Sequence, residues 1–216
     1  MTTAGRVIWL IRHGNRFDFV HPEWCKTAAR PWDCSLSDDG VTQARETGAR
    51  LARESISHVF SSPFLRAAQT ASHIAEAVDR PGKIENGLSE MLLERWFPVR
   101  PQFLTASELA AQFSRVDATY VSAVNPVYPE IAEDMLRRTA AVVHAMTERF
   151  PGNLVFVGHG GSFTGLAQAL TGDGGAIFPA LCCLIKIVRR DNAWTLEADG
   201  RDRSHLSSTE KELRIC

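Results

Sequence analysis

Five side chains of this sequence have the chemistry needed for a phosphoryl transfer. Arg12 and His13 follow one apolar segment, His159 follows another, and Arg66 and Glu90 lie between them. Guanidinium groups are planar forks that match the oxygens of a phosphate. One histidine can be a covalent nucleophile, a second can donate to the transferring group, and a carboxylate can protonate the leaving oxygen. The set is complete without a metal ion and without a serine or cysteine nucleophile.

Two apolar segments have to bring these side chains together. Residues 6–11 and 154–157 are short runs rich in β-branched residues, typical of strands buried on both faces. The first runs into Arg12-His13-Gly14 and the second into Gly158-His159-Gly160. For Arg12-His13-Gly14 alone, an ordinary polar turn after a core strand is slightly favoured. The recurrence after a second strand favours a site, because open α/β sheets bind ligands at the carboxyl ends of their strands.

Strands and helices are expected to alternate along the rest of the chain. Helices are predicted from an N-cap at Ser37, from a cap at Ser62 with Pro63 in the first turn, over 130–150, and over 162–170. Further strands are predicted at 56–60, 84–88, 181–188 and 193–198, the last as an edge strand paired with its predecessor. This alternation predicts an α/β fold, a three-layer α/β/α arrangement with a mostly parallel sheet and one antiparallel edge strand.

We expect a single domain over residues 1–216, with two long irregular segments. Residues 17–36 carry Trp24 and Trp32 and are predicted as a flap beside the site, the alternative being a surface loop whose tryptophans pack onto the core. An inserted lid is predicted at about 91–128, where Thr105 to Glu108 matches a capping box before a short helix. The tail over about 200–216 is polar and expected to be peripheral.

The composition excludes several classes of protein. The 216 residues are 44% hydrophobic and 23% charged, with a net charge of -1, so no overall attraction to nucleic acid or to an anionic membrane is expected. The sequence has neither a long apolar span nor a signal-peptide pattern, which predicts a cytoplasmic protein. Its five cysteines lack zinc spacing, so no metal site and no cofactor are expected.

The motifs in order resemble those of the histidine phosphatase superfamily, also called the phosphoglycerate mutase-like family. The similar stretches are Val7 to Arg16, Ser61 to Thr70, Gly87 to Glu90 and Gly158 to Ser162. The resemblance implies a metal-independent phosphatase that hydrolyses a phosphate monoester through a phosphohistidine. Its partner would be a small phosphorylated substrate or a phosphopeptide.

The resemblance also assigns the roles. His13 would be the nucleophile, Arg12 and Arg66 would hold the phosphate, and His159 would be the second histidine of the site. Glu90 would be the proton donor, as in the first branch of the superfamily, because Gly160 stands where the other branch places an aspartate.

The stretch after His13 favours one group within that branch. Arg12 to Arg16 has the R-H-G-x-R form of the protein-tyrosine and ecdysteroid-phosphate phosphatases, in which Arg16 would be a further phosphate contact. A surface arginine on the flap is the alternative for Arg16. Asn15 either lines the site or shapes the turn, and Gly160 is expected to contact the phosphate.

Three other functions would leave different patterns in the sequence. A serine hydrolase would need Gly-x-Ser-x-Gly, but position 164 after Ser162 is a threonine. A phosphoglycerate-type mutase of this family would carry a Glu-Ser pair after Arg-His-Gly, where this chain has Asn15-Arg16. A non-catalytic phosphate-binding module stays an alternative, although all five chemical positions are filled.

Overall fold

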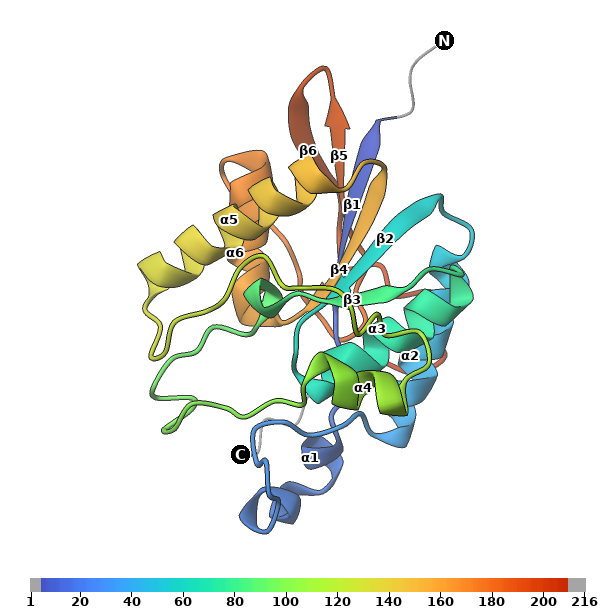
Figure 1. Ribbon diagram of the computed structural model, residues 1–216. Helices are drawn as coiled ribbons and strands as arrows, with labels where there is room; N and C mark the ends of the chain where they lie inside the picture. Colours follow the sequence, from blue (N-terminus) through green and yellow to red (C-terminus); the bar gives the residue numbers. More distant parts are fainter. Residues whose placement is uncertain (1–4, 210–216) are drawn as a thin grey trace.

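A computed structural model describes residues 5–209 of the chain, and a single six-stranded sheet lies at its centre (Figure 1). The strand order is β3-β2-β4-β1-β5-β6. The strands are β1 (Arg6–Arg12), β2 (Ile56–Ser61), β3 (Gly82–Ile84), β4 (Asn153–Gly158), β5 (Ile185–Arg190) and β6 (Ala193–Asp199). The first four pair in parallel, whereas β5 pairs antiparallel with both β1 and β6. The prediction of a mostly parallel sheet with an antiparallel edge is confirmed.

Helices cover both faces of this sheet. The helices are α1 (Phe17–Val20), η1 (Pro22–Lys26), α2 (Asp38–Leu51), α3 (Leu65–Ala77), η2 (Asn86–Leu88), α4 (Ala106–Gln112), α5 (Ala132–Arg149) and α6 (Gly160–Thr171). α2 and α3 pack together on one face, and α5 and α6 pack together on the other (Figure 1). The predicted three-layer α/β/α arrangement is therefore confirmed.

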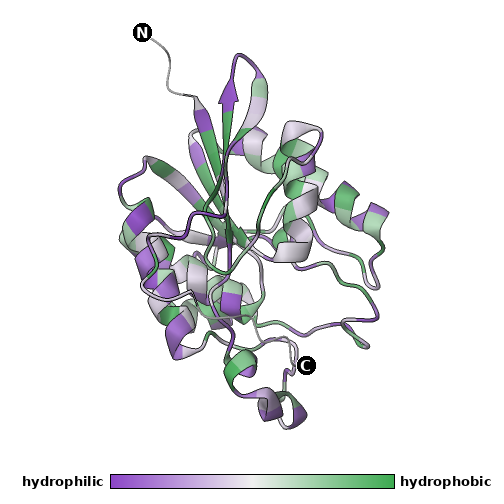
Figure 2. Ribbon diagram, turned by 180° about the vertical axis from the view of Figure 1, so that it is seen from behind, coloured by the Kyte–Doolittle hydropathy of each residue, from purple (hydrophilic) through white to green (hydrophobic). Residues whose placement is uncertain are grey.

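The alternation of side chains along each strand divides the core in two. Ile8 and Leu10 of β1 belong to the apolar cluster under α5 and α6, whereas Trp9 and Ile11 belong to the cluster under α2 and α3. Successive strand residues point to opposite faces, so a strand covered on both sides must be apolar throughout. Figure 2 shows this as hydrophobic residues along the central strands, with hydrophilic residues mainly on the outer helices and loops.

Local capping signals predicted two helix starts correctly and one wrongly. The Ser37 hydroxyl accepts a hydrogen bond from the Gly40 amide, and Thr105 and Glu108 form the predicted capping box of α4. The cap at Ser62 was wrong, because α3 begins at Leu65 and Phe64 holds the N-cap position. The strand predicted at 84–88 was also wrong: β3 ends at Ile84 and the chain then turns through η2.

The irregular segment 17–36 packs by its aromatic side chains. Trp32 packs edge-on against Phe97 at the margin of the second core cluster, with 6.1 Å between ring centroids, while Trp24 packs edge-on against Phe17. The alternative in which tryptophans pack onto the core therefore holds for Trp32. The lid predicted at about 91–128 stays a prediction. The predicted tail is described as far as residue 209, and Cys216 lies outside the described residues.

No helix within residues 5–209 is long and apolar enough to cross a membrane. The same range contains no group of three or more His, Cys, Asp or Glu side chains arranged to hold a metal ion.

Candidate active site

The carboxyl ends of β1 and β4 bring His13 and His159 together. The two strands are parallel neighbours, with Arg12 in register with Gly158. The His13 amide donates to the Gly158 carbonyl at 3.1 Å, and the ring centroids of the two histidines lie 5.2 Å apart. Two residues separated by most of the chain therefore face one another at the same sheet edge.

His13 is held with one ring nitrogen available for attack. Its Nδ1 lies 2.8 Å from the Gly14 carbonyl oxygen. Because a carbonyl oxygen only accepts, the proton of the neutral ring is on Nδ1 and the lone pair is on Nε2. Burial lowers the pKa of His13 well below its usual value, and the positive charges of Arg66 and Arg12 lower it further. The ring is therefore neutral and able to act as a nucleophile through Nε2.

His159 is oriented by a serine on the neighbouring strand. Ser62 follows β2, and its hydroxyl lies 2.8 Å from Nε2 of His159. Nδ1 of His159 lies 3.5 Å from an Nη atom of Arg66, a donor, so Nδ1 is the acceptor and Nε2 carries the proton. The Phe64 ring packs edge-on against the imidazole. Nδ1 is thus the ring atom that faces the guanidinium group.

Arg66 projects from the first turn of α3 into this space. Its guanidinium group donates to the Trp32 carbonyl at 3.1 Å and lies over the Phe64 ring. Burial, followed by the charge of Arg16, lowers the pKa of Arg66 to about 10, so the side chain is still charged at neutral pH. Within residues 5–209, Nε of Arg66 is buried without a hydrogen-bond partner. A buried cation with an unused donor is poorly satisfied until an anion binds.

Arg12 and Gly160 lie side by side at the start of α6. The Arg12 guanidinium donates to the Pro179 carbonyl at 2.9 Å. Its Cζ lies 3.6 Å from the position that a Cβ on Gly160 would take, which is van der Waals contact. Gly160 is the first residue of α6, and the first amides of a helix have no acceptor within the helix. These amides add to the positive potential near His159.

Arg16 and Asn15 occupy the turn that follows His13. Arg16 forms an ion pair with the buried carboxylate of Asp18 and lies over the Phe19 ring. Its charge lowers the pKa of both His13 and Arg66, which places it near them. The Asn15 side chain accepts a hydrogen bond from the Arg16 amide at 3.0 Å. That contact supports the alternative in which Asn15 shapes the turn.

Glu90 lies at the same end of α6, beside Gly161. Its carboxylate accepts from the Met91 amide at 2.9 Å and lies so close to Gly161 that any Cβ on that residue would collide with it. The Trp96 ring lies 3.4 Å from the same Cβ position and is 44% exposed. Glu90 and Trp96 therefore flank the first turn of α6.

The electrostatics of the site suit a dianion. Burial lowers the pKa of His159, and Arg66, His13 and Arg12 lower it further. Two neutral histidines thus lie among cationic groups, an arrangement that a bound phosphate would satisfy. Binding of a dianion would raise the pKa of His159 and let Nδ1 donate to it. The site has the parts for nucleophilic attack on phosphorus with charge stabilisation by guanidinium groups.

The structure brings His13, His159 and Arg66 together and places Arg12 and Glu90 beside the first turn of α6. The sequence pattern missed the ring-orienting role of Ser62, the carbonyl of Trp32 that holds Arg66, and Thr70, whose hydroxyl accepts from the Gly14 amide. Ser62 and Thr70 lie within the motif around Arg66, and that proximity was the only signal available. Gly14 lets the backbone of α2 approach closely at Gly40, where an added Cβ would collide with the Gly40 carbonyl oxygen.

Comparisons with known proteins agree with this geometry. The model of the histidine phosphatase superfamily (branch 1) matches residues 8–200. The chain is 29% identical over 209 residues to the ecdysteroid-phosphate phosphatase of Drosophila melanogaster. The aligned region covers 77% of this chain and 27% of that protein. It is 26% identical over 211 residues to the human ubiquitin-associated and SH3 domain-containing protein A. That alignment covers 79% of this chain and 32% of the human protein. The chain spans about a quarter to a third of the length of these relatives.

A solved structure shares the fold. The crystal structure of the Bombyx mori ecdysone phosphate phosphatase in complex with tungstate superposes with a TM-score of 0.75. The two are 24% identical, and the match covers 95% of this chain and 97% of that one. This similarity supports the arrangement of strands and helices described above.

Proposed function

Because the chain belongs to the histidine phosphatase superfamily (branch 1), as its motifs predicted, we propose that it hydrolyses phosphate monoesters through a phosphohistidine on His13 and without a metal ion. The relatives named as phosphatases support hydrolysis as the reaction. The observation that carries the proposal is the hydrogen bond from Nδ1 of His13 to the Gly14 carbonyl, with His159 and Arg66 alongside. It leaves Nε2 unprotonated where an anion would bind.

In the first step, Nε2 of His13 attacks the phosphorus atom. The new N–P bond forms as the bond from phosphorus to the ester oxygen breaks. Arg12, Arg66 and the start of α6 hold the phosphoryl oxygens, and protonated His159 donates to them through Nδ1. Glu90 gives its proton to the leaving oxygen, which departs as an alcohol or a phenol.

In the second step, water attacks the phosphorylated histidine. Glu90, now a carboxylate, takes a proton from the water as its oxygen bonds to phosphorus. The N–P bond breaks and its electron pair returns to Nε2 of His13. Inorganic phosphate leaves, and Glu90 is again protonated for the next cycle.

The proposed substrate is a phosphorylated small molecule or a phosphopeptide. Relatives named as ecdysteroid-phosphate phosphatases favour a leaving group with a large apolar body. The partly exposed Trp96 ring next to Glu90 offers apolar surface on the side where the leaving group would lie. A planar or apolar leaving group would pack there beside the acid that protonates it.

Turnover of a simple aryl phosphate tests the proposed function. We expect steady release of inorganic phosphate from 4-nitrophenyl phosphate, unchanged after prolonged incubation with EDTA. A requirement for an added divalent cation would contradict the metal-independent mechanism. Exchange of phosphate between the positions of phosphoglycerate, faster than its release to water, would favour a mutase, and thermal stabilisation by phosphate without turnover would favour a binding module.

Replacement of Glu90 by glutamine tests its role as the acid. Since general acid catalysis typically contributes about 10²-fold to 10⁴-fold, Glu90→Gln is expected to slow phenyl phosphate hydrolysis by about 10²-fold. The loss on 4-nitrophenyl phosphate should be far smaller, because nitrophenolate needs little protonation to leave. Rates under single-turnover conditions provide the measurement. Glu94→Gln, an exposed position on the same loop, is the matched control. Equal slowing of both substrates by Glu90→Gln would exclude Glu90 as the acid.

A further inference from the structure

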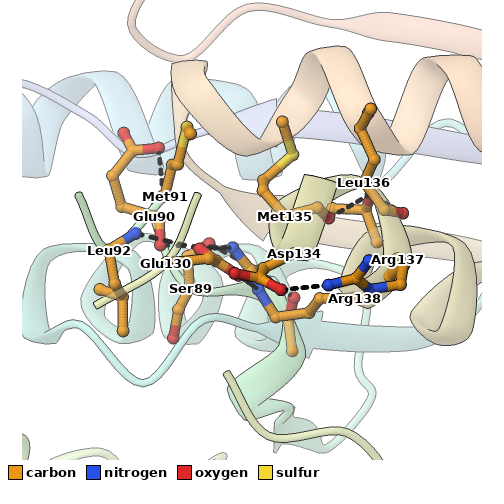
Figure 3. Close-up of polar contacts among 12 residues, drawn as sticks. Ser89, Glu90, Met91, Leu92, Glu130, Asp134, Met135, Leu136, Arg137 and Arg138 are labelled. Carbon is orange, nitrogen blue, oxygen red and sulfur yellow. Dashed lines mark hydrogen bonds and ion pairs between the residues drawn. The ribbon is translucent and has the colours of Figure 1, made fainter. Parts of the chain in front are cut away.

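A buried ion pair lies behind the loop that carries Glu90. Arg138 of α5 and Glu130, just before that helix, are 5% and 1% exposed. Nε of Arg138 donates to one carboxylate oxygen of Glu130 at 2.6 Å, and an Nη atom donates to the other at 2.8 Å (Figure 3). This two-point geometry fixes the plane of the guanidinium group. Neither residue belongs to the site described above.

The remaining donors of Arg138 bind the main chain next to Glu90. Nη1 donates to the carbonyl of Gly87 at 2.6 Å and to that of Ser89 at 3.0 Å. Nη2 lies 3.4 Å from the carbonyl of Glu90 itself. The guanidinium group therefore holds the chain immediately before the acid.

Glu130 holds the same loop on the other side of Glu90. Its carboxylate accepts from the Leu92 amide at 3.0 Å, and its own amide donates to the Leu92 carbonyl at 2.9 Å. Together the ion pair contacts the main chain on both sides of the acid, as Figure 3 shows. Residues 89–93 form no helix or strand, so these contacts replace the regular hydrogen bonds that would otherwise fix this part of the backbone.

The helix that carries Arg138 is itself fixed against the helix that begins after His159. Gly165 of α6 packs so closely on α5 that a Cβ would collide with Thr139 and Met135. The Glu90 carboxylate makes its own hydrogen bond only with the adjacent Met91 amide among the bonds of the described residues. Its place over the first turn of α6 therefore depends on how the main chain is held, and Arg138 is the group that links that main chain to α5.

We propose that Arg138, paired with Glu130, is a positioning residue that keeps Glu90 in register with the start of α6 for proton transfer. This inference rests on the proposed function, in which Glu90 is the general acid. Arg138 touches no reacting atom and acts only through the loop. Misplacement of a catalytic group by about 1 Å can cost about 10²-fold, so the position of this loop matters for the rate.

The test is Arg138→Lys assayed on a poor and a good leaving group. Lysine keeps the charge opposite Glu130 but cannot hold the carboxylate and the carbonyls of residues 87 and 89 at once. We expect a loss of about 10-fold to 10²-fold in kcat/KM for phenyl phosphate and a much smaller loss for 4-nitrophenyl phosphate. Arg137→Lys is the matched control, because Arg137 is the next residue of α5, 72% exposed, and paired with Asp134 (Figure 3). It should leave both rates unchanged.

A double-mutant cycle separates positioning from general stability. In the Glu90→Gln background, Arg138→Lys should have no further effect on kcat/KM for phenyl phosphate, because the carboxyl group that Arg138 positions is gone. A second variant, Arg138→Met with Glu130→Gln, removes the buried charges together and avoids an unpaired carboxylate. It should show the same dependence on the leaving group, with folding followed by thermal unfolding.

The outcomes separate the two ideas. If Arg138→Lys only reduces the fraction of folded protein, the rates on both substrates fall equally. That result would overturn the positioning role while the proposed function stands. An Arg138→Lys effect that persists undiminished in the Glu90→Gln background would also overturn it. If Glu90→Gln itself fails to distinguish the two substrates, the acid has been misassigned and the inference falls with it.

Discussion

Replacement of His13 by alanine is expected to lower kcat/KM for 4-nitrophenyl phosphate by about 10⁴-fold or more, the loss typical of removing a covalent nucleophile. The Nδ1 bond to the Gly14 carbonyl leaves Nε2 as the attacking atom, and no other described side chain has its place between His159 and the arginines. Steady-state assays with a detection limit below the expected residual rate provide the measurement.

The loss must come from chemistry and not from folding. His144→Ala is the matched control, because His144 lies exposed on α5, where its ring is next to the Glu148 carboxylate. Its activity should equal that of the unchanged protein. Thermal unfolding should show that His13→Ala is fully folded at the temperature of the assay. More than about a tenth of the activity remaining in His13→Ala would exclude it as the nucleophile.

Replacement of Arg66 by methionine is expected to cost about 10³-fold in kcat/KM, since loss of a single donor to a transition-state anion costs about 10²-fold to 10³-fold. Arg66 has a free Nε donor among the described residues and faces Nδ1 of His159. Aryl phosphate kinetics provide the measurement, with Arg45→Met on the exposed face of α2 as control. An activity within about tenfold of wild type would contradict the assigned role.

The same variant, Arg66→Met, should also lose the thermal stabilisation that phosphate gives to the protein. Burial lowers the pKa of Arg66 to about 10, so keeping it charged in the folded protein costs free energy at every pH below about 10. Bound phosphate would offset that cost. At a concentration of about 100 times Kd it would add about 2.7 kcal/mol, or about 5 to 10 °C in Tm. Arg66→Met should show little of this shift, and a full shift would place phosphate elsewhere.

The sheet and the two strands that end at the site could be predicted, because a strand that is buried on both faces has a recognisable sequence pattern. A strand buried on both faces is apolar throughout, as Val7 to Ile11 are, and the polar residues that follow it stand out. Ser37 and Thr105 were predicted correctly because capping depends on residues within one turn. Local chemistry was sufficient in these cases.

Ser62 shows where local rules fail. Its spacing before Pro63 fits a helix cap, but its hydroxyl contacts His159, which is 97 residues away. A tertiary partner therefore outweighed the local preference, and the helix begins later at Leu65. Arg138 and Glu130 carried no signal, because charged residues of an amphipathic helix are normally exposed. Their partners at Gly87 and Ser89 lie 51 and 49 residues before Arg138, so only the fold reveals the contact.

The central claim is a covalent bond between phosphorus and Nε2 of His13. The most direct measurement is to mix the enzyme with 4-nitrophenyl phosphate, quench it in alkaline denaturant within one turnover, and locate the phosphoryl group by peptide mass spectrometry. Glu90→Gln should raise its yield, because the water that removes the group then lacks its base. We expect a phosphoryl group that is labile in acid on the peptide containing His13. A phosphoryl group on a different residue, or none during rapid turnover, would contradict the account.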